Sequence, residues 1–138
     1  MNQEHANKII TDFPKLFKNI DNLQASLMAF GFECGDGWYN LIYDTTKRIY
    51  ELASAAGIID EEWLYVVQVK EKFGGLRYYL AGGAPEYIQK VIEEAESRSY
   101  QICEYCGAEE NVEIDETQYW MRSLCQVCNN KRNEDRQG

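Results

Sequence analysis

Two cysteine pairs near the C-terminal end constrain this chain more than any other feature of its sequence. Cys103 and Cys106 form one C-x2-C pair, Cys125 and Cys128 form the other, and eighteen residues separate the two pairs. Two intervening residues let both thiolates of a pair reach one ion from a tight turn, and zinc takes four sulfurs tetrahedrally. The spacing therefore predicts a structural zinc site, because four protein ligands leave no open coordination position. Two disulfides or a redox C-x-x-C are the alternatives that the spacing leaves open.

The segment that carries these cysteines, residues 101–138, is expected to form a small module. Residues 112–124 alternate between apolar and polar side chains, which is typical of a short hairpin. The polar stretch from Asn129 is expected to be a short helix, with the second cysteine pair in its first turn. Knuckle, hairpin and helix in this order give a treble-clef-like arrangement, and a plain zinc ribbon is the alternative. No linker separates the module from residues 1–100, so we expect the two parts to pack as one folding unit.

Composition is typical of a globular protein with a single core. The chain has 138 residues, of which 45% are hydrophobic, and this is enough for one domain. No apolar run approaches the length of a membrane span, and the N-terminus lacks the basic and apolar regions of a secretory signal. Four of the five cysteines have metal-binding spacing, so we expect a reducing, cytoplasmic location. The fifth, Cys34, is expected to be a small buried hydrophobe.

Charge argues against nucleic acid as the partner. The formal net charge of the chain is −9. Exchanging four neutral thiols for a zinc tetrathiolate adds −4 and +2, which brings the net charge to about −11. A chain with this charge is repelled as a whole by a polyanion.

Residues 1–100 are expected to form an α+β body in which helices pack on a small antiparallel hairpin. Residues 1–12 are polar and are expected to fray. Apolar residues at helical spacing predict three helical stretches: residues 13–30 (one helix or two), residues 38–56 and the residues after Pro85.

The clearest β signal runs from residue 64 to residue 80. Two alternating runs, rich in β-branched and aromatic residues, flank Gly74-Gly75, which can form a two-residue hairpin turn. In that register the core face, with Glu71 near its tip, carries Tyr65, Val67, Val69, Phe73, Leu76, Tyr78 and Leu80. The opposite face carries Val66, Gln68, Lys70, Lys72, Arg77 and Tyr79.

A basic and aromatic face on an acidic chain is the best candidate contact surface. The residues that make up this candidate are Lys70, Lys72, Arg77 and Tyr79. A guanidinium pairs with phosphate and a tyrosine ring stacks on a base, so the face suits a protein or a small anionic ligand such as a nucleotide signal. The alternative is a solvated sheet face whose bases balance nearby acids.

A glycine-punctuated turn covers residues 31–38. Asp36 is expected to cap the helix that follows the turn. Glu33 and Asp36 could instead hold a divalent cation. Both carboxylates would oppose an anion at the start of that helix.

Four stretches occur in a distinctive order along the chain. They are residues 31–38 (GFECGDGW), residues 66–77 (VVQVKEKFGGLR), C-x2-C-G at residues 103–107, and Trp120 followed by C-x2-C at residues 125–128. Together they resemble a group of small proteins carried by bacteriophages and prophages, over residues 13–128. The resemblance implies an accessory protein in the host cytoplasm that engages a host component and interferes with host defence. It implies no catalytic residue.

These residues lead to three classes of function. The first is a non-enzymatic, zinc-stabilised binding protein that grips a host protein or sequesters a nucleotide-type signal. The second is an enzyme. The only histidine, His5, is expected in a floppy N-terminus, which argues against nucleases, deaminases and triads that need a histidine. The enzyme that remains conceivable is a metal-dependent nuclease built on carboxylates and Lys70, with Asp60 and Gln68 near. The third is nucleic-acid binding by the zinc module, whose small basic end carries Arg122, Lys131, Arg132 and Arg136.

Overall fold

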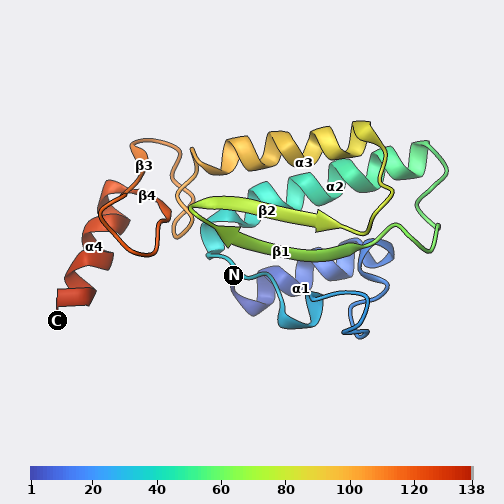
Figure 1. Ribbon diagram of the computed structural model, residues 1–138, viewed down its shortest axis with the longest axis horizontal. Helices are drawn as coiled ribbons and strands as arrows, with labels where there is room; N and C mark the ends of the chain where they lie inside the picture. Colours follow the sequence, from blue (N-terminus) through green and yellow to red (C-terminus); the bar gives the residue numbers. More distant parts are fainter. Residues whose placement is uncertain (138) are drawn as a thin grey trace.

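A body of helices and a two-stranded hairpin is followed by a small C-terminal module (Figure 1). The computed structural model describes the backbone of residues 1–137 and the side chains of residues 1–135. The α-helices within this range are α1 (Gln3–Asp12), α2 (Tyr39–Ala55), α3 (Glu86–Ser99) and α4 (Gln126–Gln137). The strands are β1 (Val66–Lys72) and β2 (Gly75–Leu80) in one antiparallel sheet, and β3 (Val112–Ile114) and β4 (Ser123–Cys125) in another. The chain is therefore an α+β protein, as the sequence predicts.

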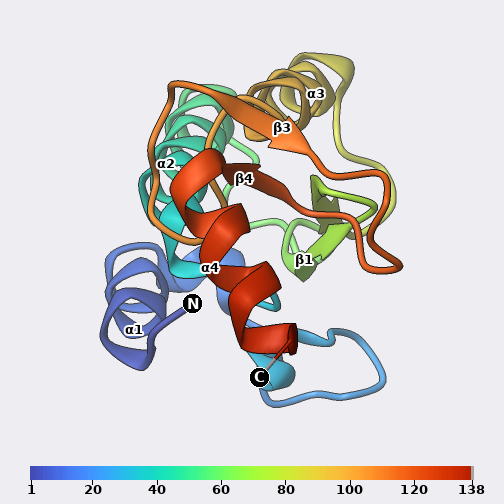
Figure 2. The same ribbon diagram turned by 90° about the vertical axis from the view of Figure 1, so that its left-hand side faces the viewer.

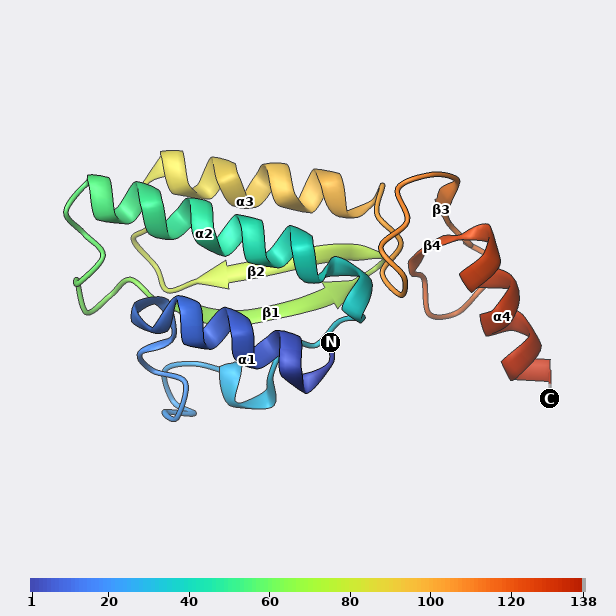
Figure 3. The same ribbon diagram turned by 180° about the vertical axis from the view of Figure 1, so that it is seen from behind.

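Helices α1 and α2 cover one face of the β1–β2 hairpin, and α3 runs beside β2 (Figure 1 and Figure 3). The apolar face of α2 is buried as predicted, and the helix ends just before Gly57, whose φ of +73° is a conformation that favours glycine. Helix α3 follows Pro85, which supplies a suitable entry to a helix. Its buried stripe consists of Ile88, Val91, Ile92 and Ala95.

The first twelve residues do not fray, contrary to the prediction. They form α1, whose first turn is capped by the Asn2 side chain accepting a hydrogen bond from the backbone N–H of His5 at 2.8 Å. The helix buries Ala6 and Ile9 against the core. Met1 and Ile10 are partly buried against the same core, so tertiary packing holds this short polar helix in place.

The helix predicted over residues 13–30 does not form. Two short 3-10 turns, η1 (Pro14–Phe17) and η2 (Met28–Phe30), lie at its ends, and the chain between them is irregular. The side chain of Asn22 accepts a hydrogen bond from the backbone N–H of Gln24 at 3.1 Å, a local contact that competes with helix formation. Phe30, expected on a buried stripe, is 68% exposed.

The hairpin turns at Phe73-Gly74, one residue earlier than the predicted Gly74-Gly75. Both turn residues have positive φ (54° and 85°), as a two-residue type I′ turn requires. Gly75 instead pairs with Lys72 in the ladder, and a Cβ atom on it would lie 2.3 Å from the hydroxyl oxygen of Tyr100. The second glycine therefore leaves room for the Tyr100 side chain where it stands.

The new turn changes which side chains face the core. Val69, Leu76 and Tyr78 are buried as predicted, but Phe73 sits in the turn and is 64% exposed. A β-bulge between Val66 and Gln68 turns Val66 inward, so that it replaces the predicted Val67 in the core.

The outer edge of β1 is covered by the segment that precedes α2. The backbone N–H of Leu27 donates to the carbonyl of Val67 at 2.7 Å, and the N–H of Glu33 donates to the carbonyl of Val69 at 3.0 Å. The N–H of Glu71 donates in turn to the carbonyl of Glu33 at 3.0 Å. These bonds fix residues 27–33 beside the hairpin and leave little of that edge free to pair with another strand.

The C-terminal module contains a knuckle at residues 103–107, the β3–β4 hairpin and α4, in that order. This is the treble-clef-like arrangement, since a helix follows the hairpin directly at Cys125, and the zinc ribbon alternative has no such helix. Across residues 1–137, no helix combines the length and the apolar character that crossing a bilayer needs.

Candidate metal centre

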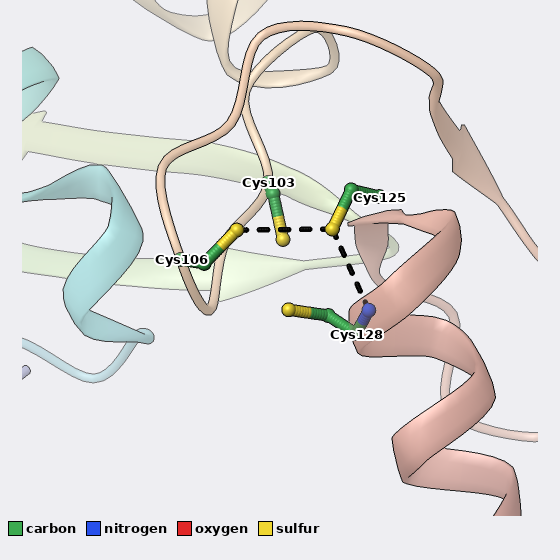
Figure 4. A group of neighbouring side chains, drawn as sticks. All are labelled: Cys103, Cys106, Cys125 and Cys128. Carbon is green, nitrogen blue, oxygen red and sulfur yellow. Dashed lines mark hydrogen bonds between the residues drawn. The ribbon is translucent and has the colours of Figure 1, made fainter.

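The four cysteines of the two C-x2-C pairs converge on one centre (Figure 4). Their sulfur atoms all lie within 4.8 Å of one another. The knuckle supplies Cys103 and Cys106, the end of β4 supplies Cys125, and the first turn of α4 supplies Cys128. Cys103 and Cys125 are buried, while Cys106 is exposed at the edge of the cluster. Four sulfurs at this separation can bind a metal ion, and thiolates favour soft or borderline ions.

The backbone around the cluster is arranged to support thiolates. The N–H of Gly107 donates to the carbonyl of Cys103 at 2.9 Å, and the φ of +83° at Gly107 closes the knuckle. The N–H of Cys128 donates to the sulfur of Cys125 at 3.5 Å. This hydrogen bond lowers the pKa of the Cys125 thiol, and so it favours the thiolate form that binds a metal.

The knuckle sits directly on the glycine-punctuated turn that precedes α2. The backbone N–H of Gly37 donates to the carbonyl of Glu104 at 2.8 Å. A Cβ atom on Gly37 would lie 2.2 Å from the carbonyl oxygen of Cys103, and one on Gly35 would lie 2.3 Å from that of Glu104. Both glycines are therefore needed because two backbones touch there. Beside them, the indole N–H of Trp38 donates to the carbonyl of Ile102 at 2.9 Å.

Glu104, between the two knuckle cysteines, is completely buried. Its Oε2 atom accepts hydrogen bonds from the N–H of Gly35 at 2.8 Å and from Nη1 of Arg122 at 2.6 Å. Burial raises the pKa of this carboxyl, although Arg122 and Gly35 act in the opposite direction. Its Oε1 atom is buried without a hydrogen-bond partner among the described side chains. The sequence pattern gave no sign of this role, because the partners lie far from Glu104 along the chain.

The tip of the β1–β2 hairpin makes a second connection to the module. The hydroxyl of Ser123 donates to the carbonyl of Gly74 at 2.7 Å. The indole N–H of Trp120 donates to Oε1 of Glu71 at 3.0 Å. Glu71, which is buried, also accepts a hydrogen bond from the N–H of Gly74 through Oε2 at 3.3 Å. Metal ligands, glycine turn and hairpin tip therefore meet in one contact region.

The predicted contact face is only partly free. Lys72 and Tyr79 are exposed, while Lys70 and Arg77 are half-buried and face each other across the two strands. Arg77 forms an ion pair with Glu96 of α3 at 2.8 Å, so its charge is balanced and it is not the open cation that we expected. Among residues 1–135, whose side chains are described, Lys70 and Lys72 form no ion pair.

The two carboxylates of the glycine turn have separate structural partners. Asp36 does not cap a helix as predicted; its carboxylate accepts from the N–H of Asn2 at 3.1 Å and contacts Nδ1 of His5 at 2.8 Å. Although burial alone would raise the pKa of Asp36, His5 and Asn2 lower it below its ordinary value. Glu33 accepts from the side-chain amide of Gln68 at 3.1 Å.

The histidine and the nuclease candidates are also engaged elsewhere. His5 lies on α1 rather than in a floppy segment, and its ring stacks on Tyr39 with 3.9 Å between centroids. Asp60 forms an ion pair with Lys15 at 2.9 Å, in the loop that follows α2. Gln68 donates to Glu33, so the expected trio with Lys70 is not assembled around a shared group.

A groove of about 600 Å³ opens beside the cysteine cluster and is lined in part by residues of α4, the helix that faces the viewer in Figure 2. We call it the α4 groove, and it is lined by Tyr105, Cys106, Trp120, Arg122, Cys128, Lys131, Arg132 and Asp135. It contains three of the four basic residues that the sequence places at this end; the side chain of the fourth, Arg136, lies outside the described residues. The aromatic residues were not predicted as part of a site, because Tyr105 and Trp120 lie fifteen residues apart in stretches without a period.

Comparison with known proteins adds no relative: the chain matches no family model, no curated protein and no solved structure.

Proposed function

We propose that the chain is a zinc-stabilised binding protein, not an enzyme, and that it engages a protein of a bacterial host. The observation that carries the proposal is that four cysteine sulfurs converge on one centre. The knuckle that supplies two of them is held against the turn before α2 by the hydrogen bond from Gly35 to Glu104. Zinc is the ion that four thiolates at this spacing suit best. A site with four protein ligands leaves no position for a substrate, so the ion would stabilise the fold rather than catalyse.

The basic side of the hairpin is the surface that we propose for the partner. Lys70 and Lys72 form no ion pair among the described side chains, and Tyr79 adds an exposed ring to the same side of the hairpin. An acidic surface on a host protein would complement these groups. Together with the resemblance to phage and prophage proteins, this supports a role as a phage accessory protein that acts in the host cytoplasm, against host defence.

The metal part of the proposal is tested by elemental analysis of protein purified without chelator. One zinc per chain is expected. A content well below half an equivalent, or another metal at full occupancy, would contradict it.

The binding part is tested by affinity capture with the tagged, zinc-loaded protein from lysate of bacteria that carry the gene, followed by mass spectrometry. The double variant Lys70→Ala/Lys72→Ala should lose the captured protein, and Lys47→Ala, on the exposed side of α2, should keep it. A nucleotide recovered in place of a protein would favour the sequestering alternative. Magnesium-dependent cleavage of DNA or RNA by the purified protein would contradict the non-enzymatic proposal.

A further inference from the structure

The α4 groove has the features of a recognition site, and it is separate from the hairpin face. We propose that it is a docking site for a peptide segment of a protein partner, in which an acidic side chain stands next to an apolar one. The proposal rests on the proposed function, because it assigns a second surface to the same binding protein.

The residue types in the groove are those that dominate binding energy at protein interfaces. Tryptophan, tyrosine and arginine are enriched among the residues whose truncation costs most. Trp120 is 56% exposed and Tyr105 is likewise open to solvent, although both are large apolar side chains. A concave surface of about 600 Å³ beside them could receive one or two partner side chains.

These groups are already held in place. The guanidinium of Arg122 lies over the rings of Tyr105 (5.6 Å to the centroid) and Trp120 (5.2 Å). The same guanidinium is tied to the buried carboxylate of Glu104, and Trp120 is anchored through its indole N–H to Glu71. A partner would therefore lose little affinity to the ordering of these side chains.

The rim of the groove favours one carboxylate on the ligand. Lys131 is exposed and forms no ion pair among the described side chains. Arg132 donates through Nη2 to the carbonyl of Trp120, while its Nη1 is buried without a hydrogen-bond partner. The guanidinium of Arg132 also lines the groove and carries only donors, so a carboxylate at the rim would meet its positive charge and that of Lys131. Asp135, on the same helix, keeps the rim from being strongly positive.

The charge around the groove disfavours phosphate-rich ligands. Cys106 and Cys128 line it, and a zinc tetrathiolate at these cysteines would bring a net charge of about −2 beside the groove. The whole chain adds a formal charge of −9, which repels a nucleic acid. A single carboxylate that is supported by apolar contacts meets far less repulsion than a nucleotide with several phosphate charges.

The test uses the zinc-loaded full chain and a library of random short peptides displayed on phage. Selected peptides are synthesised with a fluorescent label and titrated against the wild type, Trp120→Ala and Arg132→Gln. The matched controls are Tyr119→Ala, an aromatic residue next to Trp120 that is 97% exposed outside the groove, and Lys90→Ala on α3. Zinc content and melting temperature are recorded for each variant. If Trp120→Ala loses metal or stability, its weaker binding is not informative, and the affinity of Arg132→Gln tests the proposal instead.

We expect the selected peptides to share an aspartate or glutamate beside an apolar residue. The groove variants should weaken binding roughly 30-fold, and the controls should stay within about twofold. Replacing the acid of the peptide by its amide should weaken binding in the wild type and much less in Arg132→Gln. The inference is overturned if no peptide is selected, if binding ignores both groove variants, or if adenosine monophosphate binds the groove instead. Even in those cases, the proposed function would still be supported if capture of a host protein requires Lys70 and Lys72.

Discussion

Replacing Gly37 by alanine tests whether the cysteine knuckle is seated on the turn before α2. The added methyl group would lie 2.2 Å from the carbonyl oxygen of Cys103 and 2.5 Å from the backbone nitrogen of Gly107. Both are backbone atoms, so no side chain can rotate away and the knuckle itself must move. Gly82→Ala is the matched control, because a Cβ atom there meets nothing within 4 Å.

The expected cost follows from two contributions. Overpacking at a tight contact costs about 1–3 kcal/mol. A displaced knuckle also loses the hydrogen bond from the N–H of Gly37 to the carbonyl of Glu104, worth about 1 kcal/mol. The sum is about 2–4 kcal/mol, which for a domain of this size corresponds to a fall in melting temperature of about 10 °C.

Thermal unfolding followed by circular dichroism measures the effect on zinc-loaded protein, and competition with a chelator measures metal affinity. Gly37→Ala should melt about 10 °C lower and release zinc to a weaker chelator, since its knuckle no longer holds the first two ligands in place. Gly82→Ala should melt within about 2 °C of the wild type. If Gly37→Ala melts and retains zinc like the wild type, the knuckle does not rest on the turn and the reasoning is refuted.

Three further predictions concern the ligands, the hairpin register and acid stability. Cys106→Ser should lower the zinc content measured by elemental analysis, whereas Cys34→Ser, outside the cluster, should leave it unchanged. Val69→Ala should lower the free energy of unfolding in urea by about 1–3 kcal/mol, because its side chain is fully buried; a change below about 0.5 kcal/mol would contradict the register. The hydroxyl of Tyr43 donates to Asp12 at 2.6 Å and holds the pKa of that carboxyl below its ordinary 3.8, so this stabilisation is present above that pH and is lost as pH falls through the lowered pKa. Asp12→Asn should therefore lose less stability than the wild type on acidification. If the free energy of unfolding of the two proteins falls equally with pH, the hydrogen bond from Tyr43 to Asp12 does not contribute as argued.

The metal ligands could be predicted from the sequence because their geometry is local. Two residues between cysteines fix the reach of each pair, and only the meeting of Cys103 with Cys125 depends on the fold. Glu104 could not be predicted, although it lies inside the knuckle. Its partners, Gly35 and Arg122, are 69 and 18 positions away, and a glutamate in that place is otherwise an ordinary exposed residue.

The errors in the body have a common physical origin, since tertiary contacts decided between local alternatives. The predicted turn uses both Gly74 and Gly75, whereas in the structure Gly75 pairs in the ladder beside the hydroxyl of Tyr100, a contact that the local sequence does not reveal. Apolar residues at helical spacing also recur by chance in irregular chain, as the exposure of Phe30 shows. The long apolar faces of α2 and α3 leave no such choice, and the structure buries most of the side chains that were predicted to lie there.

Glu104 links these observations to the role of the metal. A buried carboxylate with one unpartnered oxygen is costly, and its ion pair with Arg122 does not by itself repay the loss of water. A metal ion that closes the knuckle would fix Glu104 where its other oxygen meets Gly35, and so the free energy of metal binding would offset that cost. The same ion pair fixes Arg122 between Tyr105 and Trp120. The metal would then do more than hold four cysteines: through Glu104 it would join the turn before α2 to the floor of the α4 groove.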